Sequence, residues 1–172
     1  MPEQDSVMLP LLSEIKVISF DVDGTLWDFD GAMRYALRQS LQELGQRHPE
    51  AVSLLNVERM IEIRDQTHES LRGMVTDLER VRLESFRRSL ESVGRPDDGL
   101  ALRLCMTYFE RRDSKRIPFP DVIPSIDALK DRYKLGILSN GNTCPKLLGL
   151  GESFEFIVMS PDHNGIEKPD PR

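Results

Sequence analysis

Residues 15–20 have the sequence Ile-Lys-Val-Ile-Ser-Phe and lead directly into Asp21-Val22-Asp23-Gly24. The first six residues are rich in β-branched and aromatic types, which predicts a short buried strand. The dipeptide Asp23-Gly24 is a turn signal. We therefore expect this strand to end in a loop that presents two carboxylates, Asp21 and Asp23.

The hydrophobic pattern changes to a helical period from about residue 31 and keeps it to about residue 115. This part of the chain contains no convincing strand, and its expected helices are separated by glycine and proline stops. It predicts a helical module inserted between strands, with helices near 31–45, 57–72, 75–93 and 98–113.

Alternating strands and helices return after Pro118 and Pro120. The pattern predicts a sheet of parallel strands joined by right-handed crossovers, so the fold class is α/β with a Rossmann-like sheet. Ligands of such sheets bind beyond the carboxyl ends of the strands. The expected elements are a helix over 122–131, a strand over 135–138 that ends at Ser139-Asn140-Gly141, a short helix over 144–150 and a strand over 156–159.

The composition is that of an ordinary globular protein, with 39% hydrophobic and 30% charged residues. Acidic residues outnumber basic ones by 29 to 23, so the net charge of -6 argues against a nucleic-acid partner. No stretch approaches the roughly 18 consecutive apolar residues of a membrane span, which argues against a membrane partner. Cys105 and Cys144 have no metal-like spacing, and we expect both to be small buried side chains in a reducing, cytoplasmic setting.

Three stretches resemble, in order, the motifs of the haloacid dehalogenase (HAD) superfamily. Asp21-Val22-Asp23-Gly24-Thr25-Leu26 resembles the first motif, Ser139 followed by Asn140-Gly141 the second, and Lys168-Pro169 the third. The first is specific by itself, whereas the other two gain weight from their order after successive strands. The resemblance covers nearly the whole chain and implies two domains. They are a catalytic core over 1–30 and 116–172, and a helical cap over 31–115.

The resemblance also implies a role for each motif residue. Asp21 would be the nucleophile that forms an aspartyl-phosphate, and Asp23 would protonate the leaving group and then deprotonate water. Ser139, with the neighbouring Asn140, would bind the phosphoryl oxygens, and Lys168 would stabilise their charge. Because dehalogenases of the superfamily lack the second aspartate, Asp23 favours a phosphatase.

A phosphate dianion needs a cation beside an aspartate nucleophile, and the resemblance implies Mg²⁺ as the cofactor. Its protein ligands would be the carboxylate of Asp21 and the backbone carbonyl of Asp23. The expected function is therefore a Mg²⁺-dependent phosphatase that acts on a small phosphorylated metabolite.

Members of the superfamily continue past the third motif to a strand with acidic Mg²⁺ ligands, whereas this sequence ends at Arg172. We therefore expect a fragment or truncated form of a longer enzyme, with apolar edge and face exposed along 15–20. Two alternatives stay open beside the phosphatase, and the missing acidic motif favours the second of them. One is a phosphomutase, which shares both aspartates, and the other is a non-catalytic, phosphate-binding regulatory protein.

Other residues allow more than one interpretation. Trp27 is expected either to close over the substrate or to pack in the core. His48, His68 and His163 share no ligand spacing, so surface positions are expected for them. Most cap arginines should lie on solvated helix faces, with one or two facing the site; they are Arg64, Arg72, Arg80, Arg82, Arg87, Arg88, Arg111 and Arg112.

Overall fold

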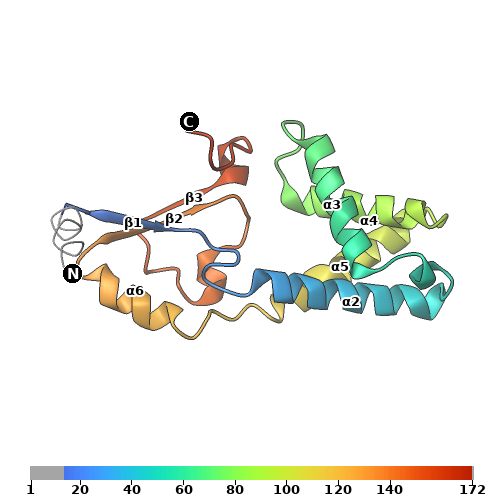
Figure 1. The fold of residues 1–172 in the computed structure, drawn as a ribbon, viewed down its shortest axis with the longest axis horizontal. Coiled ribbons are helices and arrows are strands. Elements are labelled where there is room, and N and C mark those ends of the chain that lie inside the picture. Colours follow the sequence, from blue (N-terminus) through green and yellow to red (C-terminus); the bar gives the residue numbers. More distant parts are fainter. Residues whose placement is uncertain (1–13, 172) are drawn as a thin grey trace, which may run out of the picture.

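The computed structural model describes residues 14–171 of the chain. Three parallel strands form one sheet in the order β1-β2-β3, with bounds β1 Val17–Phe20, β2 Lys134–Ser139 and β3 Phe156–Met159. Phe20 lies beside Ile137, and Ser139 lies beside Met159, so the carboxyl ends of the strands share one edge of the sheet (Figure 1). This confirms the predicted fold class, a parallel α/β sheet with a helical insert.

One face of the sheet is covered by helix α6 (Val122–Lys130). Val122 and Ile126 of this helix are buried against Leu135 and Ile137 of β2. Large apolar side chains remain exposed on the described sheet, and Ile15 and Val17 confirm the expected apolar surface at the first strand. Leu138, Phe156 and Ile157 are exposed as well.

Four helices form the insert, with bounds α2 Phe29–Arg47, α3 Val57–Leu71, α4 Leu78–Ser92 and α5 Asp98–Asp113. Each begins at a side chain that accepts a backbone N–H from its first turn, which satisfies donors that have no partner within the helix. The capping residues are Asp28, Asn56, Asp77 and Asp97. The cap at Asp28 explains why α2 begins two residues before the predicted start.

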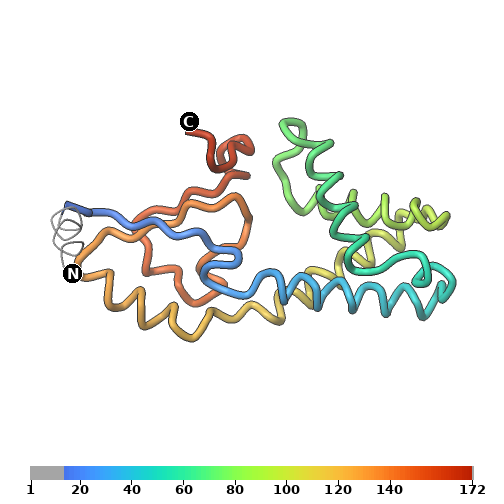
Figure 2. The backbone as a smooth tube through the Cα atoms, viewed as in Figure 1, coloured from blue at the N-terminus to red at the C-terminus, as the bar shows by residue number. Residues whose placement is uncertain are grey.

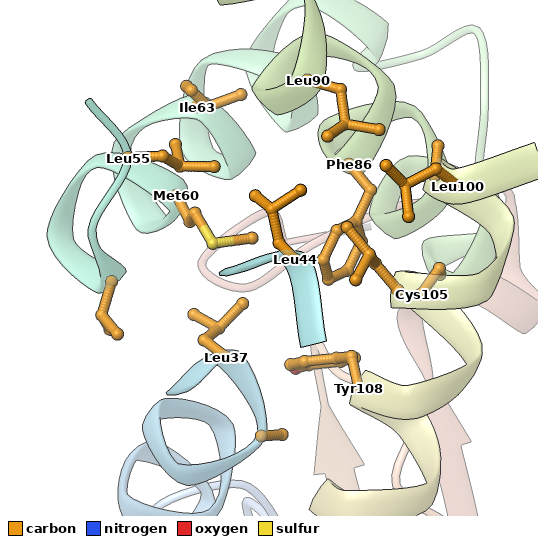
Figure 3. Packing of buried hydrophobic residues seen from close by; sticks show 14 of the residues in the cluster. Leu37, Leu44, Leu55, Met60, Ile63, Phe86, Leu90, Leu100, Cys105 and Tyr108 are labelled. Atoms are coloured by element: carbon orange, nitrogen blue, oxygen red, sulfur yellow. The ribbon is translucent and has the colours of Figure 1, made fainter. Parts of the chain in front are cut away.

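The insert has a hydrophobic cluster of its own, here called the cap cluster, to which all four helices contribute (Figure 3). Phe86 of α4 and Tyr108 of α5 meet edge to face in it, with ring centroids 6.0 Å apart. Leu37 and Leu44 of α2 are fully buried in the same cluster. The sheet and α6 surround a second cluster, here called the sheet cluster, which contains Trp27. These two clusters support the two-domain division that we propose, although residues 1–13 lie outside the described part.

The two connections between sheet and insert run side by side (Figure 2). Trp27 forms an antiparallel bridge with Pro118, and the Phe119 N–H donates to the Leu26 carbonyl over 3.0 Å. This pairing fixes the start of α2 relative to the end of α5.

Three short 3-10 turns complete the structure: η1 Ala51–Ser53, η2 Pro145–Leu148 and η3 Ser160–His163. The second replaces the helix predicted over 144–150, because Pro145 opens it and Gly149, at φ 75°, ends it. Within residues 14–171, no helix is both long and apolar enough to cross a membrane.

Candidate active site

Side chains from the loops after all three strands meet at the carboxyl edge of the sheet. Asp21 follows β1, and Lys168 lies in the segment after β3 and η3. Lys168 Nζ is 3.1 Å from Asp21 Oδ1, and it also donates to the Leu138 carbonyl of β2 over 2.7 Å. Both charged side chains remain more than a third exposed, so they are accessible to a ligand.

Asn140 holds the lysine segment in place by two reciprocal hydrogen bonds. The Lys168 N–H donates to Asn140 Oδ1 over 2.7 Å, and Asn140 Nδ2 donates to the Lys168 carbonyl over 3.2 Å. The Asn140 side chain is therefore engaged in positioning Lys168. The backbone N–H of Asn140 remains a donor for a phosphate oxygen.

Ser139, the last residue of β2, is almost fully buried. Its Oγ accepts the Gly141 N–H over 3.1 Å, which leaves the hydroxyl proton available to donate to an anion. Gly141 itself allows a close approach of two loops. A Cβ at this position would lie 2.2 Å from Asp23 Oδ2, so any larger residue would displace the Asp23 carboxylate.

Asp23 is held by Trp27, the residue for which sequence allowed two roles. The indole Nε1–H donates to Asp23 Oδ1 over 2.8 Å, and the indole is fully buried in the sheet cluster. Burial raises the pKa of the Asp23 carboxyl above its ordinary value, although the Thr143 hydroxyl, the indole hydrogen bond and the Arg112 cation partly oppose the shift. A carboxyl that keeps its proton to higher pH suits a general acid.

A cavity of about 350 Å³ lies between these loops and the helical insert. The sheet side contributes Asp23, Asn140 and Gly141, and helices α3, α4 and α5 contribute Arg64, Arg82 and Arg112. This volume is in the range of small-molecule sites.

His68 also lines the cavity and stays partly exposed there. Its Nε2 lies 3.3 Å from Glu167 Oε1, and Arg72 Nη2 lies 3.5 Å from Glu167 Oε2. These contacts link α3 of the insert to the residue before Lys168. They give His68 a partner across the cavity that its position in the sequence does not reveal.

The donor set at Asp21 and Asp23 fits part of a Mg²⁺ shell. A carboxylate and a backbone carbonyl are the hard oxygen ligands that Mg²⁺ prefers, and Mg²⁺ commonly completes its octahedron with water and phosphate oxygens. Between residues 14 and 171, no group of three or more His, Cys, Asp or Glu side chains could hold a metal. The described chain therefore supplies a partial shell.

The order of strand, acidic loop, helical insert and lysine segment is matched along almost the whole described chain by a family model of the haloacid dehalogenase-like hydrolases, over residues 15–172. The chain belongs to this family. As a HAD-like hydrolase it has the ordered motifs, the parallel sheet and the inserted helices that the sequence predicted.

A curated relative is 5-amino-6-(5-phospho-D-ribitylamino)uracil phosphatase YigB of Escherichia coli (strain K12). It is 28% identical over 161 residues, which make up 92% of this chain and 66% of the relative. The chain thus spans just under two thirds of the length of that phosphatase.

Solved structures of HAD-like proteins share the fold. A 2-haloacid dehalogenase from Pseudomonas syringae pv. Tomato DC3000 superposes with a TM-score of 0.65 at 31% identity, covering 91% of this chain and 68% of the dehalogenase. The HAD-hydrolase YfnB from Bacillus subtilis, whose structure has bound magnesium, gives the same TM-score at 22% identity, covering 86% and 66%.

Proposed function

We propose that this HAD-like chain provides the nucleophile, acid–base and phosphate-binding groups of a Mg²⁺-dependent phosphatase that acts on a small phosphorylated metabolite. The observation that supports this most strongly is the contact of Lys168 with Asp21, two residues before Asp23 in the same loop, at the carboxyl edge of the sheet. It pairs an exposed carboxylate nucleophile with a cation that can also reach a phosphoryl group.

In the first half of the reaction, an Asp21 oxygen attacks phosphorus and the bond from phosphorus to the leaving oxygen breaks. Asp23 gives its proton to that oxygen, so the alcohol leaves neutral. Ser139 Oγ–H and the Asn140 N–H donate to the phosphoryl oxygens, while Lys168 offsets the charge they develop.

In the second half, water attacks the phosphorus of the aspartyl-phosphate. Asp23, now a carboxylate, accepts a proton from this water, and the bond from phosphorus to Asp21 breaks. Inorganic phosphate leaves, and both aspartates return to their starting forms.

The groups proposed to hold Mg²⁺ are the Asp21 carboxylate and the Asp23 carbonyl. When bound, the ion would supply positive charge that lowers the repulsion between the phosphate dianion and Asp21. A solved structure of a HAD-like relative with bound magnesium supports this choice of metal.

Dehalogenation is a competing proposal, since the similar Pseudomonas syringae protein is a dehalogenase. Asp23 favours the phosphatase, because carbon–halogen cleavage releases a halide that needs no proton, whereas an alkoxide does. The Trp27 hydrogen bond orients the Asp23 carboxyl, and burial raises its pKa, which suits a group that donates a proton.

The test is hydrolysis of p-nitrophenyl phosphate by the 172-residue chain, with Mg²⁺ and with EDTA, beside Asp21→Asn. We expect metal-dependent turnover that falls by three or more orders of magnitude in the variant, because the amide cannot act as the nucleophile. Equal activity in the variant would exclude Asp21 as the nucleophile. A folded chain that binds inorganic phosphate without turnover would instead support the phosphate-binding alternative.

A further inference from the structure

Three arginines from three different helices face the cavity that contains Asp23. Arg64 comes from α3, Arg82 from α4 and Arg112 from α5. Like charges gathered in a partly enclosed space repel one another, and that repulsion grows as water is removed. Such a group is stable only where anions compensate it.

Arg82 has no compensating carboxylate within the described residues. It is 8% exposed, and its guanidinium lies 4.3 Å from the centroid of the Tyr108 ring. Burial, together with the neighbouring Arg64 and Arg112 cations, lowers its pKa below the ordinary value. An arginine nevertheless stays protonated at neutral pH, so the cavity wall has a buried and uncompensated positive charge.

The other two cations are only partly neutralised. Arg112 donates through Nε to Asp113 Oδ1 over 2.9 Å, yet Asp113 is shared with Arg116. Arg64 Nε lies 3.0 Å from Asp65 Oδ1, but this buried N–H makes no hydrogen bond.

The carboxylates that line the cavity are Asp23 and Glu167. Glu167 is engaged by His68 and Arg72, as described above, and Asp23 bonds with the Trp27 indole. The structure therefore offers Arg82 a site for a further anion.

We propose that Arg64, Arg82 and Arg112 form a subsite for a second anionic group on the substrate, at the end remote from the phosphate ester. The proposal rests on the proposed function, because Asp23 there protonates the leaving oxygen. The alcohol part of the ester must then lie in the cavity, between Asp23 and the arginines. The substrate class is a phosphate monoester whose alcohol has a carboxylate or a second phosphate.

The subsite can be tested by binding, without turnover. Isothermal titration in Mg²⁺ buffer would compare 3-phosphonopropanoate with propylphosphonate, which differ in the anionic group at the far end. We expect the former to bind the wild-type chain about tenfold or more tightly, the scale of a charge-assisted contact. Propane-1,3-diphosphonate is a third probe, and whichever of the two probes with an anionic group at each end binds more tightly identifies carboxylate or phosphate as the far group.

Arg82→Met removes the charge and keeps a flexible apolar chain over Tyr108. We expect the preference for 3-phosphonopropanoate to fall close to one, and Arg82→Lys to restore part of it. The matched control is Arg80→Met, on the same helix but exposed and away from the cavity, which should keep the full preference. Arg64→Met gives a second measurement if Arg82→Met does not fold.

The proposal is overturned if wild type binds 3-phosphonopropanoate no better than propylphosphonate or not at all. It is also overturned if the preference survives in both Arg82→Met and Arg64→Met. Hydrolysis of p-nitrophenyl phosphate is measured in parallel. Turnover without an anion preference would reject the subsite and leave the proposed phosphatase standing. An Arg82-dependent preference without turnover would reject the phosphatase and leave the anion subsite standing.

Discussion

Asp23 is the residue whose surroundings determine most of the proposed chemistry. Trp27 fixes one carboxylate oxygen and Gly141 leaves room for the other, so these two contacts orient the carboxyl in the lining of the cavity. Burial is the largest cause of the raised pKa of this carboxyl. The same burial makes it a poor site for a permanent charge, which is consistent with a proton that moves on and off.

Asp23→Asn should lower kcat/KM by about 10²- to 10⁴-fold for alkyl phosphates, because their leaving oxygen needs a proton. The loss should be much smaller for p-nitrophenyl phosphate, whose phenolate leaves without protonation. The amide oxygen can still accept the Trp27 N–H, so the fold should persist. Steady-state kinetics on both esters gives the comparison, and an equal loss for both would contradict the role of general acid.

The two cysteines differ more than their sequence context suggested. Cys105 is buried in the cap cluster as expected, but Cys144 is exposed, so the prediction that both are buried is wrong for Cys144. Cys144 immediately precedes the η2 turn, which stands where a short helix over 144–150 was predicted.

Burial raises the pKa of the Cys105 thiol to about 11 from 9.0. The native state therefore binds this proton more tightly than the unfolded state. The resulting contribution to the free energy of unfolding is fully present below pH 9 and is lost as pH rises through about 11.

Iodoacetamide at about pH 8.5 should modify Cys144 and leave Cys105 unmodified, as measured by peptide mass. In urea both cysteines should react. Comparable native rates would contradict the burial. Cys105→Ala should remove this pH dependence of unfolding.

At the scale of elements, the hydrophobic period predicted the helices and strands closely. The strand Phe156–Met159 and the helix Asp98–Asp113 have the predicted bounds. Both have strong local signals, a short β-branched run in one case and an apolar stripe with an aspartate cap in the other. The prediction of a helix over 144–150 is wrong, because Pro145 and Gly149 leave space for only a single 3-10 turn.

The motif residues could be predicted because parallel strands bring their carboxyl ends to one edge. Charge alone does not distinguish the cavity-lining arginines from the exposed ones. A signal was present: Arg82 lies four residues from both Leu78 and Phe86, and Arg112 lies four residues from Tyr108. A cation within a buried stripe is therefore a better indicator of a site than its charge alone. The contact of His68 with Glu167 joins segments far apart in the chain, which residue spacing does not encode.

For the whole molecule, the relation between the two hydrophobic clusters matters most, because the cavity lies between the parts that they stabilise. Helix α2 belongs to both: Ala32 is buried in the sheet cluster, and Met33 is buried in the cap cluster. Phe29 is partly buried and packs against both clusters, with its ring centroid 5.7 Å from that of Trp27. Core and cap should therefore unfold together.

Phe29→Ala should uncouple them, because it removes the aromatic ring that contacts both clusters at the base of α2. Truncation of a fully buried phenylalanine to alanine lowers the free energy of unfolding by about 3–5 kcal/mol, and truncation of a partly buried one should lower it less.

Trp27 is the chain's one tryptophan and lies in the sheet cluster, so its fluorescence reports on that part. Far-UV circular dichroism at the helical minimum reports mainly on the cap. Urea transitions by the two probes should coincide in wild type and separate in Phe29→Ala. Phe109→Ala, a partly buried phenylalanine that packs against the cap cluster alone, is the control for general destabilisation. Coincident transitions in Phe29→Ala would show that the paired connections at Trp27 and Pro118 are sufficient to couple the two parts.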